Sequence, residues 1–239
     1  MKNIIAVLTS VIISFSLLGC DKCGENYEEI VNSPKEEVKI HTLTPLEKIV
    51  YHAEKQPDLH CTYDGSYRSM KYPGGDIERS TGVCTDVVIR SLRAGDIDLQ
   101  RLIHEDMKMN LSVYNKRYRT KVVDANIDHR RTQNIQTYLS KLGVTKLDVS
   151  KMSPKDFKPG DIVFWDIAAG HTGIVVTTRT YDDENHLVVH NIGAGPKSED
   201  MLSFWAPIEA YRLDSADIKR MQLNSDYVHD FKTDPYFKN

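Results

Sequence analysis

The apolar residues change their spacing midway along the chain, and no other feature of the sequence constrains the fold as strongly. In the N-terminal half they recur at helical spacing, as Leu46, Ile49 and Val50 do, which is typical of helices with one buried face. From Ile162 onward they form short β-branched and aromatic runs separated by turn residues. A chain with helices first and strands afterwards is predicted to be an α+β domain, with N-terminal helices packed on a C-terminal antiparallel sheet.

Capping residues and stop glycines place the predicted helices. Thr44, Pro45 and Glu47 form a capping box with proline at the first helical position, so a helix is predicted to begin there. Gly95 and Gly143 are the predicted C-terminal stops of two later helices. A polar turn is predicted to join the second and third strands into a hairpin. The predicted strands are 162–165, 172–178, 187–190 and 210–213.

The first 20 residues have the layout of a secretory signal. Lys2 precedes an apolar run at 4–18 that is too short to cross a membrane comfortably, and Leu17-Leu18-Gly19-Cys20 ends the segment. This ending resembles the lipobox of bacterial lipoproteins, which implies that Cys20 becomes the lipidated first residue of the mature chain. A plain signal peptide and an uncleaved anchor are the alternatives.

A charged tether is predicted between this signal and the folded domain. Residues 21–43 are rich in Glu and Lys and poor in large apolar side chains, so they are expected to stay solvated. Asp21 directly follows Cys20, which resembles an inner-membrane retention signal of enteric bacteria. The predicted organisation is a signal at 1–20, this tether and one domain at 44–239, lipid-anchored in the bacterial cell envelope and facing the periplasm.

The net charge and the number of cysteines limit which partners and which thiol pairings are expected. The net charge of −3 gives no electrostatic reason to expect a nucleic-acid partner. If Cys20 carries lipid, Cys23, Cys61 and Cys84 remain, which is an odd number in an oxidising compartment. One thiol must then stay free or pair with another chain. A Cys23–Cys61 bridge that leaves Cys84 free is one of the arrangements left open.

Cys84 opens an apolar run that is predicted to be a helix. The first backbone N–H groups of a helix have no internal partner, and their dipoles leave a partial positive charge there. That charge favours a thiolate over a thiol, so Cys84 is predicted to have a lowered pKa and to act as a nucleophile. The alternative is that Cys84 is a small buried apolar residue, as many unpaired cysteines are.

Two histidines sit at the ends of the predicted hairpin strands. His171 begins one strand and His190 ends the next, and their midpoint falls just before the polar turn. An antiparallel hairpin with a slightly lopsided loop is therefore predicted to bring the two imidazoles side by side. One histidine can then serve as the base for Cys84 while the other orients it.

The segment 124–131 is unusually dense in hydrogen-bonding side chains, among them Asp128, His129 and Arg130. It is predicted to be either a solvated loop or a substrate-recognition loop in which Arg130 or Arg131 forks onto a carboxylate. No cofactor and no metal are predicted, because the scattered histidines lack a tight ligand spacing. The histidines considered for a metal site are His104, His129, His171 and His190.

The order of these motifs resembles the NlpC-type branch of the papain-like cysteine peptidases, which are bacterial cell-wall hydrolases. Their pattern is a Cys opening a helix, a Gly-Asp strand start, a His-x-Gly-Ile strand and a strand that ends in a third polar residue. The matching positions here are Cys84, Gly160-Asp161-Ile162, His171-Thr172-Gly173-Ile174 and His190. Val83 stands where these peptidases usually carry Asp, and the turn between the two histidine strands is longer than usual.

From about Pro45 to Leu213 the chain also resembles the YijF-like bacterial domains of unknown function. The matching blocks are Tyr72-Pro73-Gly74-Gly75-Asp76, Gly82-Val83-Cys84-Thr85-Asp86, Asn126-Ile127-Asp128-His129-Arg130-Arg131 and His190-Asn191-Ile192-Gly193.

The resemblance implies a papain-like fold with Cys84 as nucleophile, His171 as base and His190 as orienting residue. It implies a hydrolase that cuts an amide bond in peptidoglycan stem peptides through a thioester, with the Cys84 N–H and the Tyr63 hydroxyl as oxyanion donors. The alternative is a non-catalytic, cell-wall-binding lipoprotein that keeps the fold. The candidate substrate-binding or oxyanion residues are Tyr63, Asp86, Asp128, His129, Arg130 and Asn191.

Overall fold

The computed structural model describes residues 40–114 and 121–237. The predicted signal, the lipidation site Cys20, the thiol of Cys23 and most of the predicted tether lie outside these residues. The described part begins with a short 3-10 turn, Ile40–Thr42, and Ile40 already packs against buried side chains of the domain. No helix among the described residues is both long enough and apolar enough to cross a membrane.

The helices begin and end where the local chemistry predicts. The predicted capping box is present, because the Glu47 N–H donates to Thr44 Oγ1 over 3.3 Å and the Thr44 N–H donates to Glu47 Oε2 over 2.7 Å. Gly143 ends its helix in the left-handed conformation with φ of 78°. The helices are α2 (Pro45–Lys55), α3 (Cys84–Ala94), α4 (Leu99–Tyr114), α5 (Thr132–Leu142), α6 (Met201–Phe204) and α7 (Ser215–Ser225). Further 3-10 turns lie at Gln56–Asp58, Asp128–Arg130, Val149–Lys151, Pro154–Asp156 and Pro235–Phe237.

The strands of the C-terminal half form one six-stranded sheet in the order β3-β8-β4-β5-β6-β7, and every neighbouring pair is antiparallel. A separate short pair, β1 and β2, is parallel and precedes α3. The predicted α+β class, with helices and an antiparallel sheet, is therefore confirmed, although α6 lies between β7 and β8 and α7 follows β8. The strands are β1 (Thr62–Tyr63), β2 (Thr81–Gly82), β3 (Thr145–Lys146), β4 (Ile162–Trp165), β5 (His171–Arg179), β6 (His186–Asn191), β7 (Pro196–Glu199) and β8 (Glu209–Arg212).

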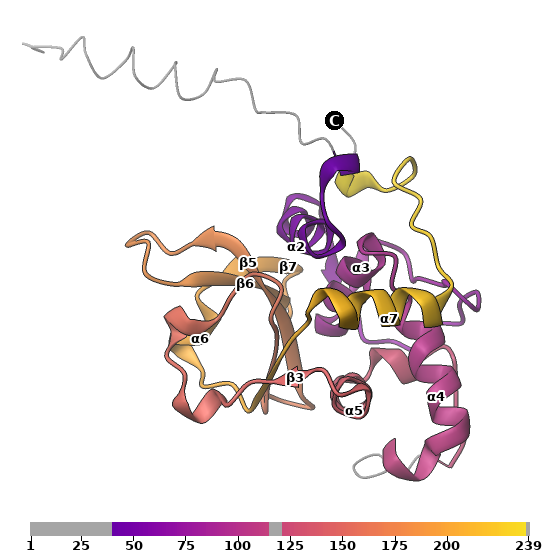
Figure 1. Cartoon of the computed structure of the whole chain (residues 1–239). Helices are drawn as coiled ribbons and strands as arrows, with labels where there is room; N and C mark the ends of the chain where they lie inside the picture. The colour runs from indigo at the N-terminus through magenta and orange to yellow at the C-terminus, as the bar shows by residue number, and fades with distance from the viewer. Residues whose placement is uncertain (1–39, 115–120, 238–239) are drawn as a thin grey trace, which may run out of the picture. The chain divides into compact units, whose positions relative to one another are not determined.

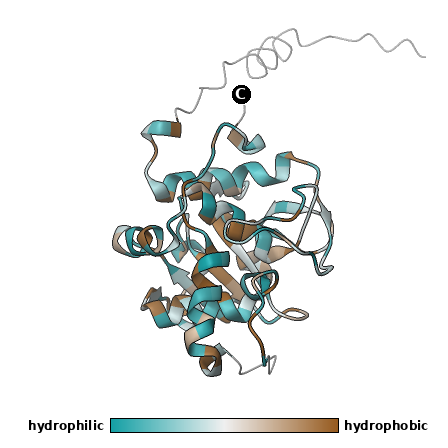
Figure 2. Cartoon of the chain, turned by 90° about the vertical axis from the view of Figure 1, so that its right-hand side faces the viewer, coloured by the Kyte–Doolittle hydropathy of each residue, from teal (hydrophilic) through white to brown (hydrophobic). Residues whose placement is uncertain are grey.

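The sheet is covered on both faces, and the alternation of its side chains explains how. Most helices lie together on one side of the sheet, whereas α6 lies on the other (Figure 1). Ile174 and Val176 of β5 point into the larger apolar core with α2 and α3, while Val175 between them points into a smaller core with α6. Figure 2 shows hydrophobic segments in the interior and hydrophilic ones on the outer turns of the helices.

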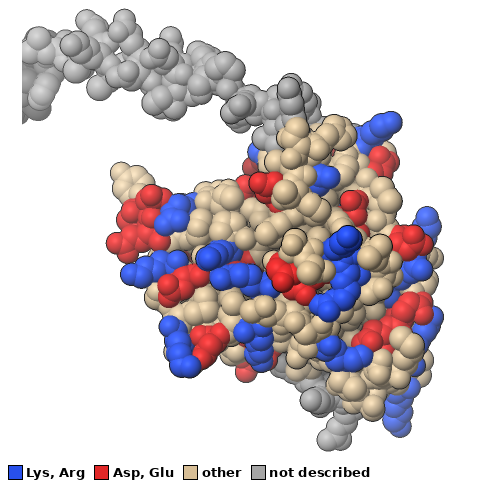
Figure 3. Space-filling view, viewed as in Figure 1, with Lys and Arg blue, Asp and Glu red and all other residues tan. Residues whose placement is uncertain are grey.

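Acidic and basic side chains are mixed across the face drawn in Figure 3. No single-sign stripe dominates that face, which fits the small net charge of −3.

Candidate active site at the start of helix α3

Cys84 is the first residue of α3, as the sequence predicts. Val83 before it is extended, and its N–H donates to the Asp86 carboxylate over 2.7 Å. Asp86 therefore makes one half of a capping box by accepting from the Val83 N–H, whereas Val83 has no side-chain oxygen to make the other half. The helix start is fixed at Cys84, and its sulfur lies beside the first, unpaired N–H groups of the helix.

The surroundings of Cys84 favour the neutral thiol, so the thiolate predicted from the sequence is corrected. Cys84 is only 6% exposed, and burial raises the pKa of its thiol to about 11. Backbone N–H groups of Thr172, Thr85 and Cys84 itself act in the opposite direction, but they do not outweigh the loss of solvation. At neutral pH Cys84 is a thiol.

This raised pKa predicts a slow and strongly pH-dependent alkylation. We expect the rate of iodoacetamide modification at Cys84 to be low at pH 7 and to rise steadily toward pH 11, because only the thiolate reacts. Peptide mass spectrometry after timed quenching measures the rate at Cys84 separately from that at Cys61, the other free thiol among the described residues. A half-maximal rate near pH 7 would contradict the description of the site.

His171 and His190 lie in contact, which confirms the prediction from the hairpin. Nε2 of His171 is 3.0 Å from Nδ1 of His190, and the two rings are perpendicular. The register differs in one detail, because Gly173 is directly opposite His190 and His171 is therefore its diagonal neighbour. The end of the hairpin pairs Arg179 with His186, so its turn is centred two residues beyond the midpoint of the two histidines, and the irregularity between Val175 and Arg179 removes only half of that offset.

Glu199 contacts the second histidine of this pair, and the sequence did not predict it. Its Oε2 lies 3.0 Å from Nε2 of His190. Glu199 is on β7, which pairs with β6 so that Lys197 is opposite His190. Its strand, Pro-Lys-Ser-Glu, has no apolar alternation, so no signal in the sequence marks it as a strand.

The carboxylate of Glu199 fixes the tautomers of both histidines. A carboxylate only accepts hydrogen bonds, so Nε2 of His190 carries the proton and Nδ1 of a neutral His190 is an acceptor. Nε2 of His171 must then be the donor between the two rings, which leaves the lone pair on Nδ1 of His171. That nitrogen is the one able to accept a proton.

Both imidazoles are held neutral. Burial, reinforced by the neighbouring His190, lowers the pKa of His171 to about 4. Burial also lowers the pKa of His190, although Glu199 acts against that shift. A neutral imidazole near a neutral thiol is the resting state at pH 7.

The position of His171 relative to Cys84 follows from the chain. The Thr172 N–H reaches the Cys84 sulfur, and His171 immediately precedes Thr172 on β5. Among the described residues the hydrogen bond of the His171 ring goes to His190, with none to Cys84. Such contacts are often long in unliganded enzymes and shorten when substrate binds.

Arg130 forms an ion pair inside the protein. The prediction that its guanidinium binds a substrate carboxylate is therefore corrected. Its Nε and Nη2 donate to the two oxygens of Asp86 over 2.9 and 2.8 Å, and both side chains are buried. The Thr85 hydroxyl also donates to the Arg130 carbonyl over 3.1 Å. Asp86 and Arg130 therefore anchor the first turn of α3 instead of presenting charge to a ligand.

Asp128 and His129 are likewise buried, so the dense polar segment is an internal support and not a solvated loop. Asp128 Oδ2 accepts from the Asp124 N–H over 2.6 Å and lies 3.4 Å from Nδ1 of His104. Burial and nearby arginines lower the pKa of His129 to about 3. The predicted role of these two residues in substrate contact is corrected to a structural one, because their polar groups face the interior.

Asn191 and Tyr63 flank Cys84 in different ways. The Asn191 amide donates to the Gly82 carbonyl over 3.0 Å, so it ties the end of β6 to the segment before the nucleophile. Tyr63 is 47% exposed, and its partial burial is the main cause that raises the pKa of its hydroxyl. Tyr63 is thus a partly exposed hydroxyl beside Cys84, and its role as an oxyanion donor stays a prediction.

Within the part of the chain that the structure describes, no three His, Cys, Asp or Glu side chains are grouped so as to hold a metal ion. The side chains at the site can supply a nucleophile, a base and hydrogen bonds.

Comparison with known proteins identifies the family. The family described as "Domain of unknown function (DUF1287)" matches residues 50–213. The chain is 43% identical over 162 residues to "Uncharacterized protein YijF" of Escherichia coli (strain K12), which covers 67% of this chain and 78% of that protein. No solved structure matches the chain. The resemblance to the YijF-like domains is therefore confirmed.

Proposed function

Because the chain belongs to the DUF1287 family, whose function is unknown, we propose a function from the site itself: a cysteine hydrolase of the cell envelope that cleaves an amide bond in peptidoglycan stem peptides. The observation that carries this proposal is the hydrogen-bonded series His171–His190–Glu199. Its first member, His171, directly precedes Thr172, whose N–H contacts the Cys84 sulfur. A nucleophile, a base and a group that orients the base are the parts that acyl transfer requires. The order of the motifs supports an NlpC-type papain-like fold as part of the same proposal.

The neutral resting state sets the form of the proposed reaction. Nδ1 of His171 takes the thiol proton as the Cys84 sulfur attacks the amide carbonyl, so no preformed ion pair is needed. The Cys84 N–H and the Tyr63 hydroxyl are the proposed donors to the oxyanion. The His171 proton then passes to the departing amine, which leaves a thioester on Cys84. Water, activated by the same histidine, releases the acid and restores the thiol.

A second candidate, a cell-wall-binding lipoprotein without turnover, is favoured by one observation. Cys84 is 6% exposed with a pKa raised to about 11, so its sulfur is a poor nucleophile until a base acts on it. In this alternative the domain is held in the envelope through Cys20 and binds peptidoglycan without cutting it.

Digestion of purified peptidoglycan distinguishes the two functions. The hydrolase predicts that the wild-type protein releases soluble peptides with new amino and carboxyl ends, whereas Cys84→Ala releases none. Cys61→Ala is the matched control, because Cys61 is also a buried free thiol but contacts none of the residues proposed to react. Cosedimentation of the wild-type protein with peptidoglycan, without released peptide, would support the binding lipoprotein instead.

We also propose that the protein is lipid-anchored at Cys20. The proposal rests on the Leu17-Leu18-Gly19-Cys20 ending and the apolar run before it. Labelling of cells with radioactive palmitate should mark the wild-type protein and not Cys20→Ala. Equal labelling of the two proteins would overturn the anchor.

A further inference from the structure

A second polar cavity, of about 130 Å³, lies away from the residues assigned to hydrolysis. Four separate parts of the chain form its wall: α2, the segment before β2, α3 and the segment that follows α7. None of the proposed catalytic residues contributes to it. Its lining includes His52 of α2, Gly74 and Arg79 before β2, and Tyr227 and His229 after α7.

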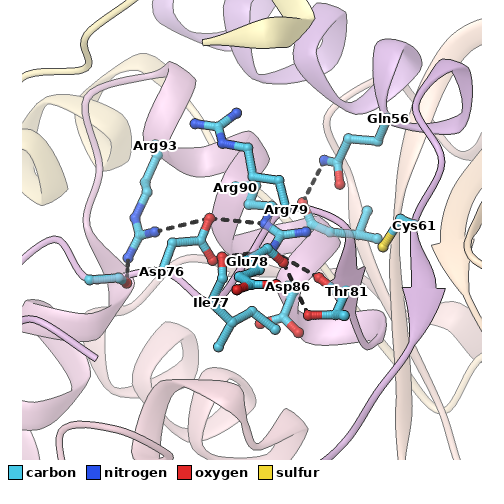
Figure 4. Close-up of polar contacts among 12 residues, drawn as sticks. Gln56, Cys61, Asp76, Ile77, Glu78, Arg79, Thr81, Asp86, Arg90 and Arg93 are labelled. Atoms are coloured by element: carbon cyan, nitrogen blue, oxygen red, sulfur yellow. Dashed lines mark hydrogen bonds and ion pairs between the residues drawn. The ribbon is translucent and has the colours of Figure 1, made fainter. Parts of the chain in front are cut away.

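Arginines outnumber carboxylates among the side chains that line this cavity. The lining contains three arginines, Arg79, Arg90 and Arg93, and a single carboxylate, Asp76. Asp76 lies between two of them, 3.0 Å from Nε of Arg90 and 3.8 Å from Nη1 of Arg93 (Figure 4). Two guanidinium groups therefore share one carboxylate at the cavity surface.

Other carboxylates hold these arginines from behind the wall. Asp98 lies 3.3 Å from Nη2 of Arg93, and Asp234 lies 2.7 Å from Nη1 of Arg79. These contacts fix the positions of the guanidinium groups while leaving both carboxylates out of the cavity lining. The guanidinium groups are thus held in fixed positions, which lowers the cost of ordering them around an anion.

One donor of this wall has no partner in the protein. The Arg93 side chain is only 5% exposed, and its buried Nε makes no hydrogen bond within the described structure. A buried N–H without an acceptor is costly, and native proteins generally satisfy such groups. An acceptor of negative charge is the partner that a guanidinium N–H favours most.

The size of the cavity limits the ligand. A volume of about 130 Å³ is well below the roughly 300–1,000 Å³ of pockets for drug-sized ligands. Tyr227 packs on Gly74 in the cavity wall, with its ring 3.3 Å from where a Cβ on Gly74 would stand. The space suits an anion of a few atoms and excludes a nucleotide or a sugar chain.

We propose that this cavity binds a small oxyanion, phosphate-like or a short carboxylate, through the guanidinium groups of Arg79 and Arg93, while Asp76 holds Arg90 beside them. The bound anion joins α3, which carries Arg93, to the segment before β2, which carries Arg79. This site is independent of the proposed hydrolysis, since no residue is shared with it.

Titration calorimetry of the full-length protein at constant ionic strength tests the proposal, with inorganic phosphate, sulfate and acetate as separate ligands. We expect saturable binding of at least one of them with one site per chain. Preference for phosphate and sulfate indicates a tetrahedral oxyanion, and preference for acetate indicates a carboxylate. Arg79→Gln should bind about tenfold more weakly or worse, because it removes one charge-assisted contact.

Arg220→Gln is the matched control, because Arg220 is similarly exposed and also pairs with an aspartate, Asp217, but does not line the cavity. Its affinity should equal that of the wild type. If Arg79→Gln does not fold, Arg79→Lys is the substitute, because it keeps the positive charge beside Asp234 but lacks the paired N–H donors of a guanidinium. This variant too should bind the anion more weakly than the wild type. Absence of saturable binding for all three anions, or wild-type affinity in the Arg79 variant that folds, overturns the proposal.

Discussion

Cys84→Ala is expected to lower kcat/KM for the release of peptide from peptidoglycan by roughly 10⁴-fold or more, and His171→Ala is expected to lower it as much. The reason is that the thiol of Cys84 has a pKa raised to about 11 and does not react without a base. Nucleophile and base act as one unit, so the double variant should be no worse than either single one. Initial rates on purified peptidoglycan, with circular dichroism to show that each variant is folded, measure the effect.

The orienting residues provide the contrast. His190→Ala should lose less activity than His171→Ala, because His190 positions the base without touching the substrate. Glu199→Gln should lose less again, since the carbonyl oxygen of the new Gln side chain can still accept from Nε2 of His190. If His171→Ala retained the activity of the wild type, the assignment of the base would be wrong.

Asp86→Ala is expected to cause the largest loss of stability among single changes near the site, roughly 3–5 kcal/mol in the free energy of unfolding. Removing the carboxylate leaves the Arg130 guanidinium buried without its partner, and it also leaves the Val83 N–H without an acceptor. Urea unfolding followed by circular dichroism measures this change.

An exposed ion pair supplies the control for this stability change. Arg220 and Asp217 lie 2.6 Å apart on the first turns of α7, with the Arg220 side chain 46% exposed. Arg220→Ala should cost less than about 1 kcal/mol, because exposed pairs contribute little. An Asp86→Ala loss as small as that of Arg220→Ala would show that the pair with Arg130 does not anchor α3.

The helix and strand pattern could be predicted from the sequence because local chemistry determines it. The capping box at Thr44 and the continuous apolar run Ile162–Trp165 act within a few residues, and both appear where they were expected. The contact between His171 and His190 was also predictable, since a hairpin relates them by a simple register. The offset of that register was not predictable, because it depends on where the turn is centred and on the irregularity between Val175 and Arg179.

Features that depend on long-range packing were not predictable. Glu199 reaches His190 from a polar strand whose pairing is set by the rest of the sheet. Arg130 looked free to bind a ligand, but the fold brings it to Asp86, 44 residues earlier in the chain. The helix start at Cys84 predicted a thiolate, and burial by the sheet reversed that expectation because desolvation depends on the tertiary structure.

Intact-protein mass spectrometry of an acid-quenched reaction tests the proposed chemistry most directly, because a thioester survives in acid while turnover stops. Wild-type protein mixed with soluble peptidoglycan fragments should gain the mass of the acyl fragment, and peptide mapping should place that mass on Cys84. Cys84→Ala should show neither the adduct nor released product. Product formation by the Cys84→Ala protein at the rate of the wild type would contradict the assignment of Cys84 as the nucleophile.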